Sequence, residues 1–329
     1  MKIAVLIPCY NEAATIGKVV EDFQKNIPEA DIYVYDNNSS DNTAKIAASV
    51  GAIVVQERRQ GKGNVVRSMF KDIDADIYVM IDGDDTYPVE AVHDVIKPVM
   101  YNRADMVIGE RMTNGTYAKE NSRAMHGFGN NLVKRLINFL FKSKLTDIMT
   151  GYRAFSRYYV KTYPVSSRGF EIETEMTVYA LHNNYNIVEV PINFRDRPEG
   201  SFSKLNTYRD GFKVLRIIFL LFKDYRPLLF FGISSLLLAF TGLLIGISPI
   251  LEFIKEGYVH KVPSAILASG FEIIAMLLFA CGLILDTTVK HQKALHEQLS
   301  NLFLISDKKK DTSSSSRNTR YVNAAYHAK

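Results

Sequence analysis

Two long apolar stretches constrain the fold of this chain more than any other feature. Residues 227–251 hold no charged side chain over 25 positions, and residues 262–285 hold one, Glu272, over 24 positions. As a helix, each stretch is long enough to cross the hydrocarbon core of a bilayer. The alternative is a pair of buried helices in a soluble protein. We predict two transmembrane helices, and we expect Glu272 to face protein or lipid headgroups because a charge inside the membrane is costly.

Basic residues indicate how this helical hairpin is oriented. They lie before the first stretch and after the second: Lys213, Arg216, Lys223, Arg226, Lys290, Lys293 and residues 308–310. The connecting segment carries two lysines, Lys255 and Lys261. Because cytoplasmic segments are enriched in Lys and Arg, both ends of the hairpin are expected on the cytoplasmic side.

The first 110 residues alternate between apolar runs and amphipathic segments. The runs predict strands at residues 3–8, 31–36, 52–57, 76–82 and 105–110. The segments between them predict helices at residues 14–27, 43–51, 63–73 and 89–101. This alternation is typical of an α/β domain with a largely parallel, doubly wound sheet, in which ligands bind beyond the carboxyl ends of the strands. That edge would carry residues 8–12, 36–41, 82–85 and Arg111.

The chain between residue 112 and the first apolar stretch is less regular. A helix is expected at residues 128–142 and a strand at 187–194. Residues 205–224 combine helical spacing, basic side chains and a strongly apolar end, which favours a helix on a membrane surface over a solvated core helix. The predicted organisation is a cytoplasmic domain (1–204), an amphipathic helix (205–226), the hairpin, and a cytoplasmic basic tail (286–329) that is partly disordered.

The formal charge of the chain, +5, is concentrated in its tail. Residues 307–329 hold six Lys or Arg against two Asp, so the remainder is nearly balanced. A nearly balanced domain does not indicate nucleic-acid binding. The Ser-rich, basic tail is expected to contact anionic membrane lipids instead.

Three carboxylates follow the predicted strand that ends near residue 82. They are Asp82, Asp84 and Asp85 of the sequence DGDDTYP. Asp, Gly and Pro are common in turns, so a polar turn is one interpretation. The other is a metal site, because Gly83 permits a tight turn and carboxylate oxygens suit Mg²⁺ or Mn²⁺. We favour metal binding by Asp82 and Asp84, and a structural role for Asp85 as a cap of the next helix.

Eight short motifs occur in a fixed order along the chain. They are IPCYNE (7–12), VYDNNSSDNT (34–43), GKGNVVR (61–67), DGDDTYP (82–88), IGER (108–111), TGYRAFSR (150–157), GFEIETEM (169–176) and RPEGSFSKL (197–205). This ordered set resembles family 2 glycosyltransferases of the GT-A fold. Within that family the motifs are similar to those of the branch that includes dolichol-phosphate mannose synthase and the bacterial polyprenyl-phosphate glycosyltransferases. The resemblance covers residues 1–226. A two-span anchor is also typical of the bacterial members.

The resemblance implies a site for a nucleotide-sugar donor. The residues that would border the nucleotide are Pro8, Tyr10, Asn11, Glu12, Asp36 and Asn38. Lys62, between two glycines, would bring one cation to a phosphate. Asp82 and Asp84 would hold the metal on the diphosphate. Some lipid-phosphate members have Gln where this chain has Thr86, so a third side-chain ligand is left open.

The resemblance also implies a site for an acceptor phosphate. Arg111, Arg123 and Lys204 would contact it, since guanidinium groups match phosphate geometry. Arg197 belongs to the same group of cations, and Tyr152 and Arg153 would line the sugar or phosphate pocket. Glu171, Glu173 and Glu175 alternate on an expected strand or extended segment. Of the three we select Glu173 to order the sugar hydroxyls or a base.

The chemistry of such an acceptor explains why no catalytic His is evident. A phosphate monoester is mostly anionic at neutral pH, so it needs positioning and charge neutralisation more than a general base. In-line attack would invert the anomeric carbon. The expected reaction is transfer of one sugar, from UDP-glucose or a UDP-N-acetylhexosamine, to undecaprenyl phosphate. It would occur at the cytoplasmic face of a bacterial inner membrane, in a multi-pass protein that forms homo-oligomers as family members often do.

Four alternatives to this reaction differ from it in the donor, the product, the acceptor or the presence of activity. GDP-mannose could replace the UDP-sugar as donor. A processive polysaccharide synthase is disfavoured, because the chain has no Trp for the Gln-x-x-Arg-Trp segment of that group and too few spans for a channel. A soluble acceptor would not require phosphate-binding cations beside a membrane helix. A catalytically silent membrane scaffold would not require Asp82 and Asp84.

Overall fold

The computed structural model describes residues 1–113, 124–169, 171–195 and 219–326. The chain divides into two compact units, Met1–Val214 with Phe303–Lys329 and Leu215–Leu302. The predicted boundary after residue 204 lies outside the described residues, as does most of the predicted amphipathic helix. Its last part, residues 219–225, is helical.

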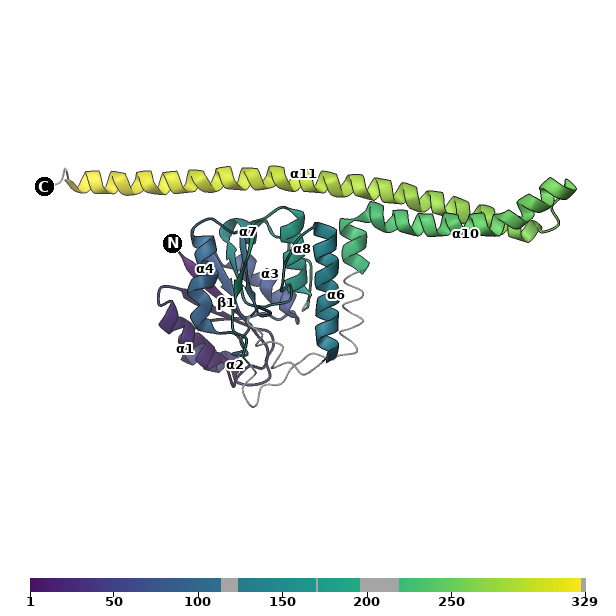
Figure 1. Ribbon diagram of the computed structural model, residues 1–329. Coiled ribbons are helices and arrows are strands. Elements are labelled where there is room, and N and C mark those ends of the chain that lie inside the picture. Colours follow the sequence, from purple (N-terminus) through teal and green to yellow (C-terminus); the bar gives the residue numbers. More distant parts are fainter. Residues whose placement is uncertain (114–123, 170, 196–218, 327–329) are drawn as a thin grey trace. The chain divides into compact units, whose positions relative to one another are not determined.

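The first unit is built on a seven-stranded sheet with the order β3-β2-β1-β4-β6-β5-β7. Figure 1 shows β1 among the helices of this unit. The strands are β1 (Ile3–Cys9), β2 (Asp31–Asp36), β3 (Ile53–Gln56), β4 (Ile77–Met80), β5 (Met106–Glu110), β6 (Arg153–Ser156) and β7 (Ile187–Pro191). The helices are α1 (Ile16–Asn26), α2 (Thr43–Ser49), α3 (Lys62–Asp72), η1 (Val89–Ala91), α4 (Val92–Met100), α6 (Ala124–Phe141), α7 (Arg157–Thr162) and α8 (Ile172–His182). All nine segments predicted before residue 110 are confirmed within a few residues.

Six of the seven strands, all except β6, run in the same direction, so their carboxyl ends lie at one edge. β1 pairs in parallel with β2, with Cys9 opposite Asp36, and with β4, with Leu6 opposite Met80. β6 is antiparallel to both β4 and β5, so β5 runs in the direction of β4. The predicted common edge of strand ends is therefore present, although the sheet is mixed, and ligand binding at this edge stays a prediction.

The continuous apolar run of β1 is explained by helices on both faces of the sheet. Val5 and Ile7 belong to one core cluster, which includes side chains of α1, α2 and α4. Ala4 and Leu6 belong to the other, which includes side chains of α3, α7 and α8. A strand buried on both faces has no solvent-facing positions to fill with polar residues.

Three elements were missing from the sequence prediction, namely β6, α7 and α8. β6 has only four residues and includes an arginine, so it lacks the apolar run that marks the other inner strands. α8 was mistaken for a strand or extended segment because its glutamates alternate. The predicted helix at 128–142 and strand at 187–194 correspond to α6 and β7.

The second unit contains the helical hairpin predicted from the apolar stretches. α10 (Pro227–Glu256) begins with Pro at its first position and ends at Gly257 in a left-handed conformation. α11 begins at Val262 and continues to Tyr326, so the tail expected to be partly disordered from residue 286 is helical to that point. Both helices are long and apolar enough to cross a membrane.

Small residues let the two hairpin helices pack closely. Gly242 of α10 lies against Ala268, Phe271 and Glu272 of α11, so Glu272 faces protein as expected. The Ser235 hydroxyl donates to the Ala275 carbonyl across the hairpin, at 2.7 Å. Close backbone approach at glycine is common between membrane helices.

Gly63, in the first turn of α3, should not tolerate a side chain. A Cβ there would lie 2.3 Å from the Ser167 carbonyl oxygen and 2.7 Å from its carbon, both backbone atoms. We expect Gly63→Ala to lower the unfolding free energy by about 1–3 kcal/mol, the usual cost of overpacking, although Ala favours helix. Thermal unfolding of the full chain in detergent would measure the change.

The matched control is Gly17→Ala in α1, where the methyl would meet only the end of the Ile46 side chain, at 3.2 Å. This variant should unfold close to the wild-type temperature. Equal stability of Gly63→Ala and wild type would show that the segment at Ser167 moves freely away from α3.

Candidate active site

The three aspartates after β4 have different surroundings. Asp84 is buried and accepts hydrogen bonds from the Thr86 hydroxyl, at 2.6 Å, and from its backbone N–H. Asp85 forms a salt bridge with Lys18 at 2.7 Å. The predicted cap role for Asp85 is wrong, because the N-cap residue of η1 is Pro88 and this N-cap has no side-chain hydrogen bond. Asp82 is the exposed member of the three, with 27% of its side chain accessible.

Asp82 forms an ion pair with Lys62, and Lys62 forms a second ion pair with Glu173. The Lys62 ammonium, at the start of α3, lies 2.5 Å from Asp82 Oδ1 and 2.5 Å from Glu173 Oε1. Burial alone would lower the pKa of Lys62, but attraction to both carboxylates outweighs it, so the pKa is raised and the lysine stays charged. Gly151 borders the same carboxylate, since a Cβ there would lie 2.4 Å from Asp82 Oδ2.

The structure corrects the expectation that Glu173 lies on a strand. It is in the first turn of α8, which Glu171 precedes as the N-cap residue. The outer glutamates bind the backbone ahead of the helix: Glu171 accepts from Arg168 and Gly169, and Glu175 accepts from Ser166 and Ser167. Acidic side chains near a helix N-terminus are favourable there. The alternation of glutamates therefore reflects this N-terminus and not the two faces of a strand.

The loops after β1 and β2 hold each other in place. Asn11 and Asn38 both have positive φ angles, 54° and 61°. The Asn11 side chain accepts from the Ser40 N–H at 2.7 Å, and the Asn38 amide donates to the Arg58 carbonyl at 2.8 Å. The Glu12 N–H donates to the Thr43 hydroxyl at 2.9 Å. Pro8 is partly exposed and Tyr10 is exposed, so both lie on the predicted edge.

Asp36 lies at the end of β2, and its two carboxylate oxygens differ in their hydrogen bonds. Its Oδ2 accepts from the Ser39 N–H at 3.2 Å. Its Oδ1 is buried and, among the described residues, has no hydrogen-bond partner. A buried unsatisfied carboxylate oxygen is costly and calls for an explanation. A ligand that donates a hydrogen bond here would supply one.

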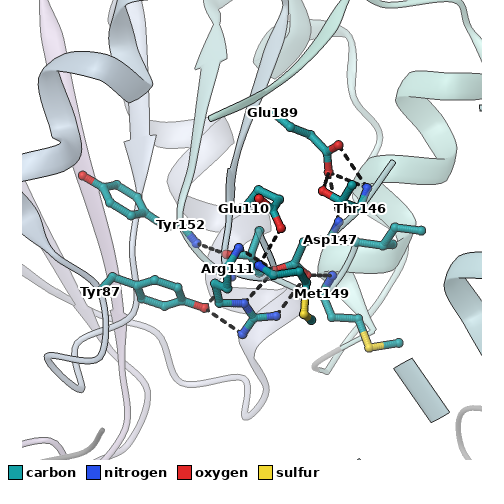
Figure 2. A network of polar contacts seen from close by, with 12 residues as sticks. Tyr87, Glu110, Arg111, Thr146, Asp147, Met149, Tyr152 and Glu189 are labelled. Carbon is teal, nitrogen blue, oxygen red and sulfur yellow. Dashed lines mark hydrogen bonds and ion pairs between the residues drawn. The ribbon is translucent and has the colours of Figure 1, made fainter. Parts of the chain in front are cut away.

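Arg111, directly after β5, is part of a buried ion pair (Figure 2). Its Nε and Nη2 donate to the two carboxylate oxygens of Asp147, at 2.7 and 3.0 Å, and Nη1 lies 3.5 Å from the Tyr87 hydroxyl. Although burial alone would raise the pKa of Asp147, Arg111 holds it below its ordinary value. Glu189 fixes the loop from the other side by accepting from the N–H groups of Thr146 and Asp147.

Arg153 is placed differently from the expectation that it lines a ligand pocket. It is fully buried, and its guanidinium donates to the carbonyls of Ile148 and Thr150 and to the Thr177 hydroxyl. Tyr152 is also fully buried. Arg153 therefore holds the segment before β6 in place. Arg123, Arg197 and Lys204 lie outside the described residues.

Sequence reasoning missed Asp147, Glu189 and Gly151 as members of this region. Asp147 could have been noticed, since it is an acidic residue in the apolar sequence LTDIMTGY, shortly before a recognised motif. Nothing in the sequence pairs it with Arg111. Nothing in the sequence pairs Glu189 with Thr146 either, since the two are 43 positions apart.

The donor atoms of Asp82 and Asp84 suit a divalent metal ion. Hard carboxylate oxygens are the ligands of Mg²⁺ and Mn²⁺, which usually keep several waters and bind substrate phosphates. In the described part of the chain, the one set of three His, Cys, Asp or Glu ligand atoms that lie close together is Glu252, Glu256 and His260, in the other unit. Asp82 and Asp84 could thus supply two ligands, with the remainder from substrate and water.

Comparison with known proteins identifies the class to which this fold and site belong. A family model described as glycosyl transferase family 2 matches residues 4–163. The glycosyltransferase AglJ of Haloferax volcanii is 31% identical over 302 residues, covering 90% of this chain and 97% of that protein. The chain therefore belongs to glycosyl transferase family 2.

Two further proteins are similar to this chain, one in sequence and one in fold. A dolichyl-phosphate hexose transferase of Haloferax volcanii is 30% identical over 209 residues, 64% of this chain and 89% of that protein. Glucosyl-3-phosphoglycerate synthase from Mycobacterium tuberculosis, solved with Mn²⁺, UDP and glucosyl-3-phosphoglycerate, superposes with a TM-score of 0.55. The two proteins are 21% identical, and the match covers 68% of this chain and 79% of the synthase chain. The match confirms the predicted GT-A fold.

The Arg111–Asp147 pair should contribute more to stability than an exposed pair. Asp147→Asn leaves the guanidinium buried beside a neutral group, and breaking a buried pair costs about 3–5 kcal/mol. The matched control is Glu90→Gln, which breaks the exposed pair of Glu90 with Arg195, at 3.0 Å. That loss should be below about 1 kcal/mol. Equal changes in thermal unfolding temperature for the two variants would contradict the role assigned to Asp147.

Proposed function

We propose that this protein transfers one sugar from a nucleotide diphosphate-sugar to a polyprenyl phosphate at the cytoplasmic face of a bacterial inner membrane. The observation that carries the proposal is the acidic edge of a family 2 sheet in a chain that also has two helices able to span a bilayer. A lipid acceptor explains why the two occur together. The relative that acts, by its name, as a dolichyl-phosphate hexose transferase supports the same acceptor class.

The donor would lie along the ends of β1, β2 and β4. Asp36 offers the unsatisfied buried Oδ1 to an N–H or O–H of the nucleotide. The loops that contain Pro8, Tyr10, Asn11, Glu12 and Asn38 would border it. We take the donor to be UDP-glucose or a UDP-N-acetylhexosamine, which agrees with the UDP in the superposed synthase.

Asp82 and Asp84 would hold a divalent ion against the diphosphate. When bound, such an ion neutralises charge that develops on the departing nucleotide. The Thr86 hydroxyl donates to Asp84 at 2.6 Å. It orients that carboxylate, in the way that groups behind a ligand often do.

The acceptor phosphate would be bound by cationic side chains of the protein. Arg111 already shares its charge with Asp147, which reduces what it can offer to a second anion. We therefore assign the phosphate first to Arg123, Arg197 and Lys204. Arg111 would hold the loop that contains Asp147 through its ion pair. The phosphate oxygen is the nucleophile, and its attack on the anomeric carbon inverts that centre.

Asp82→Asn and Asp84→Asn should each lower sugar transfer by about a thousandfold, because metal stabilisation of a departing diphosphate is worth several kcal/mol. The assay incubates membranes that contain the protein with radiolabelled UDP- and GDP-sugars, a polyprenyl phosphate and Mn²⁺, and measures lipid-linked product. Asp85→Asn is the matched control, because Asp85 is next in sequence and is paired with Lys18. It should keep most of the activity.

Two results would contradict the proposal at different points. Transfer that proceeds equally well without a divalent ion would remove the role of Asp82 and Asp84. The absence of a lipid-linked product with every donor would remove the acceptor assignment.

A further inference from the structure

We infer that Lys62 is an internal counter-ion that sets how tightly the Asp82–Asp84 site binds its divalent cation. The inference rests on the metal site of the proposed function. It differs from the phosphate contact expected for Lys62, because it assigns the lysine to the protein side of Asp82. Lys62 would then act through Asp82 as a positioning residue.

The order of burial places Lys62 behind Asp82. The Lys62 side chain is 9% exposed and that of Glu173 is 6% exposed, whereas Asp82 is 27% exposed. The ammonium lies 2.5 Å from an oxygen of each carboxylate. From the interior outward, the groups are thus Glu173, Lys62 and Asp82. A cation arriving from solvent would meet Asp82 first.

The backbone around Lys62 holds this arrangement in place. Gly61, with a φ of 124°, and Gly63 let α3 start directly against the carbonyls of Ser167 and Arg168. The Gly63 N–H donates to the Arg168 carbonyl at 3.1 Å. The same loop is bound by the glutamates at the start of α8, the helix that carries Glu173. Lys62 and Glu173 are therefore brought together by two fixed helix starts.

The formal charges of this cluster match one divalent ion. Lys62 pairs with Asp82 and Glu173, and Asp84 follows Asp82 by two positions in the same turn. Counted as ionised, the three carboxylates carry three negative charges and Lys62 carries one positive charge, which leaves two negative charges. Asp85 is balanced separately by Lys18. Without Lys62 the cluster would have one more net negative charge, and without Glu173 one fewer. Buried charges are screened weakly, so each change should be felt at the metal.

Opposite effects on metal affinity follow from removing the two partners. Lys62→Met should tighten Mn²⁺ binding, and Glu173→Gln should weaken it, each on the order of tenfold for a unit charge at this range. Lys62→Arg keeps the charge and should restore the wild-type affinity. The double variant Lys62→Met/Glu173→Gln keeps the net charge and should also bind nearly as wild type does. If the single Lys62→Met variant fails to fold around an unpaired Glu173, the double variant can still be compared with Glu173→Gln, and it should bind Mn²⁺ more tightly than that variant.

The experiment titrates the purified full-length protein in detergent with Mn²⁺ alone and follows free Mn²⁺ by electron paramagnetic resonance. No nucleotide is present, so a lysine that only contacts phosphate would leave every affinity unchanged. Asp82→Asn and Asp84→Asn report whether the bound ion is at the proposed site. Activity is not needed for any of these measurements.

The results distinguish a failure of the inference about Lys62 from a failure of the metal site itself. If wild type binds Mn²⁺ and Asp82→Asn abolishes binding, but Lys62→Met binds equally or more weakly, the inference is overturned and the metal site stands. Tighter binding by Glu173→Gln would overturn it as well. If wild type binds no Mn²⁺, or if both aspartate variants bind as wild type does, the metal site itself is wrong and the inference falls with it.

Discussion

The parallel pairing of β1 with β2 and β4 is the constraint on which the site depends. β1 lies between these strands and is buried on both faces, so its neighbours are fixed in register by hydrogen bonds and by two core clusters. Parallel strands deliver their carboxyl ends to one edge, and the chain places Asp36 and the aspartates after β4 there. A chemically useful edge thus follows from backbone direction before any side chain is considered.

The opposite side of the site is built by contacts that are long-range in sequence. α3 and α8 both begin near Asp82, one with Lys62 and the other with Glu173, and the backbone at residues 166–169 joins the two helix starts. Glycine is needed where these backbones meet, because a Cβ at Gly63 or Gly151 would overlap backbone or the Asp82 carboxylate. The glycines in these motifs consequently have a packing role, which is separate from any contact with phosphate.

The sequence predicted the first five strands and the edge at which they end because their signals are local and strong. Apolar runs mark strands buried on both faces, and the residues after each run lie at the edge. β6 gave no such signal, since Arg153 occupies an interior position that depends on the carbonyls of Ile148 and Thr150. The partners of Lys62 and Arg111 could not be predicted either. Asp147 is 36 positions from Arg111, and only the fold brings them together.

The charged groups at this edge are largely paired within the protein. Asp85 has Lys18, Arg111 has Asp147, and Lys62 has both Asp82 and Glu173. Two acceptor groups are less fully compensated, namely the unsatisfied Oδ1 of Asp36 and the carboxylate of Asp82, which is paired with Lys62 but remains partly exposed. Internal pairing lowers the cost of keeping many charges at one buried edge, because most of these carboxylates have a cation close by. It also directs ligands to the groups that are not fully compensated, so the pattern of pairing, as much as the residue types, decides where a donor and its cation would bind.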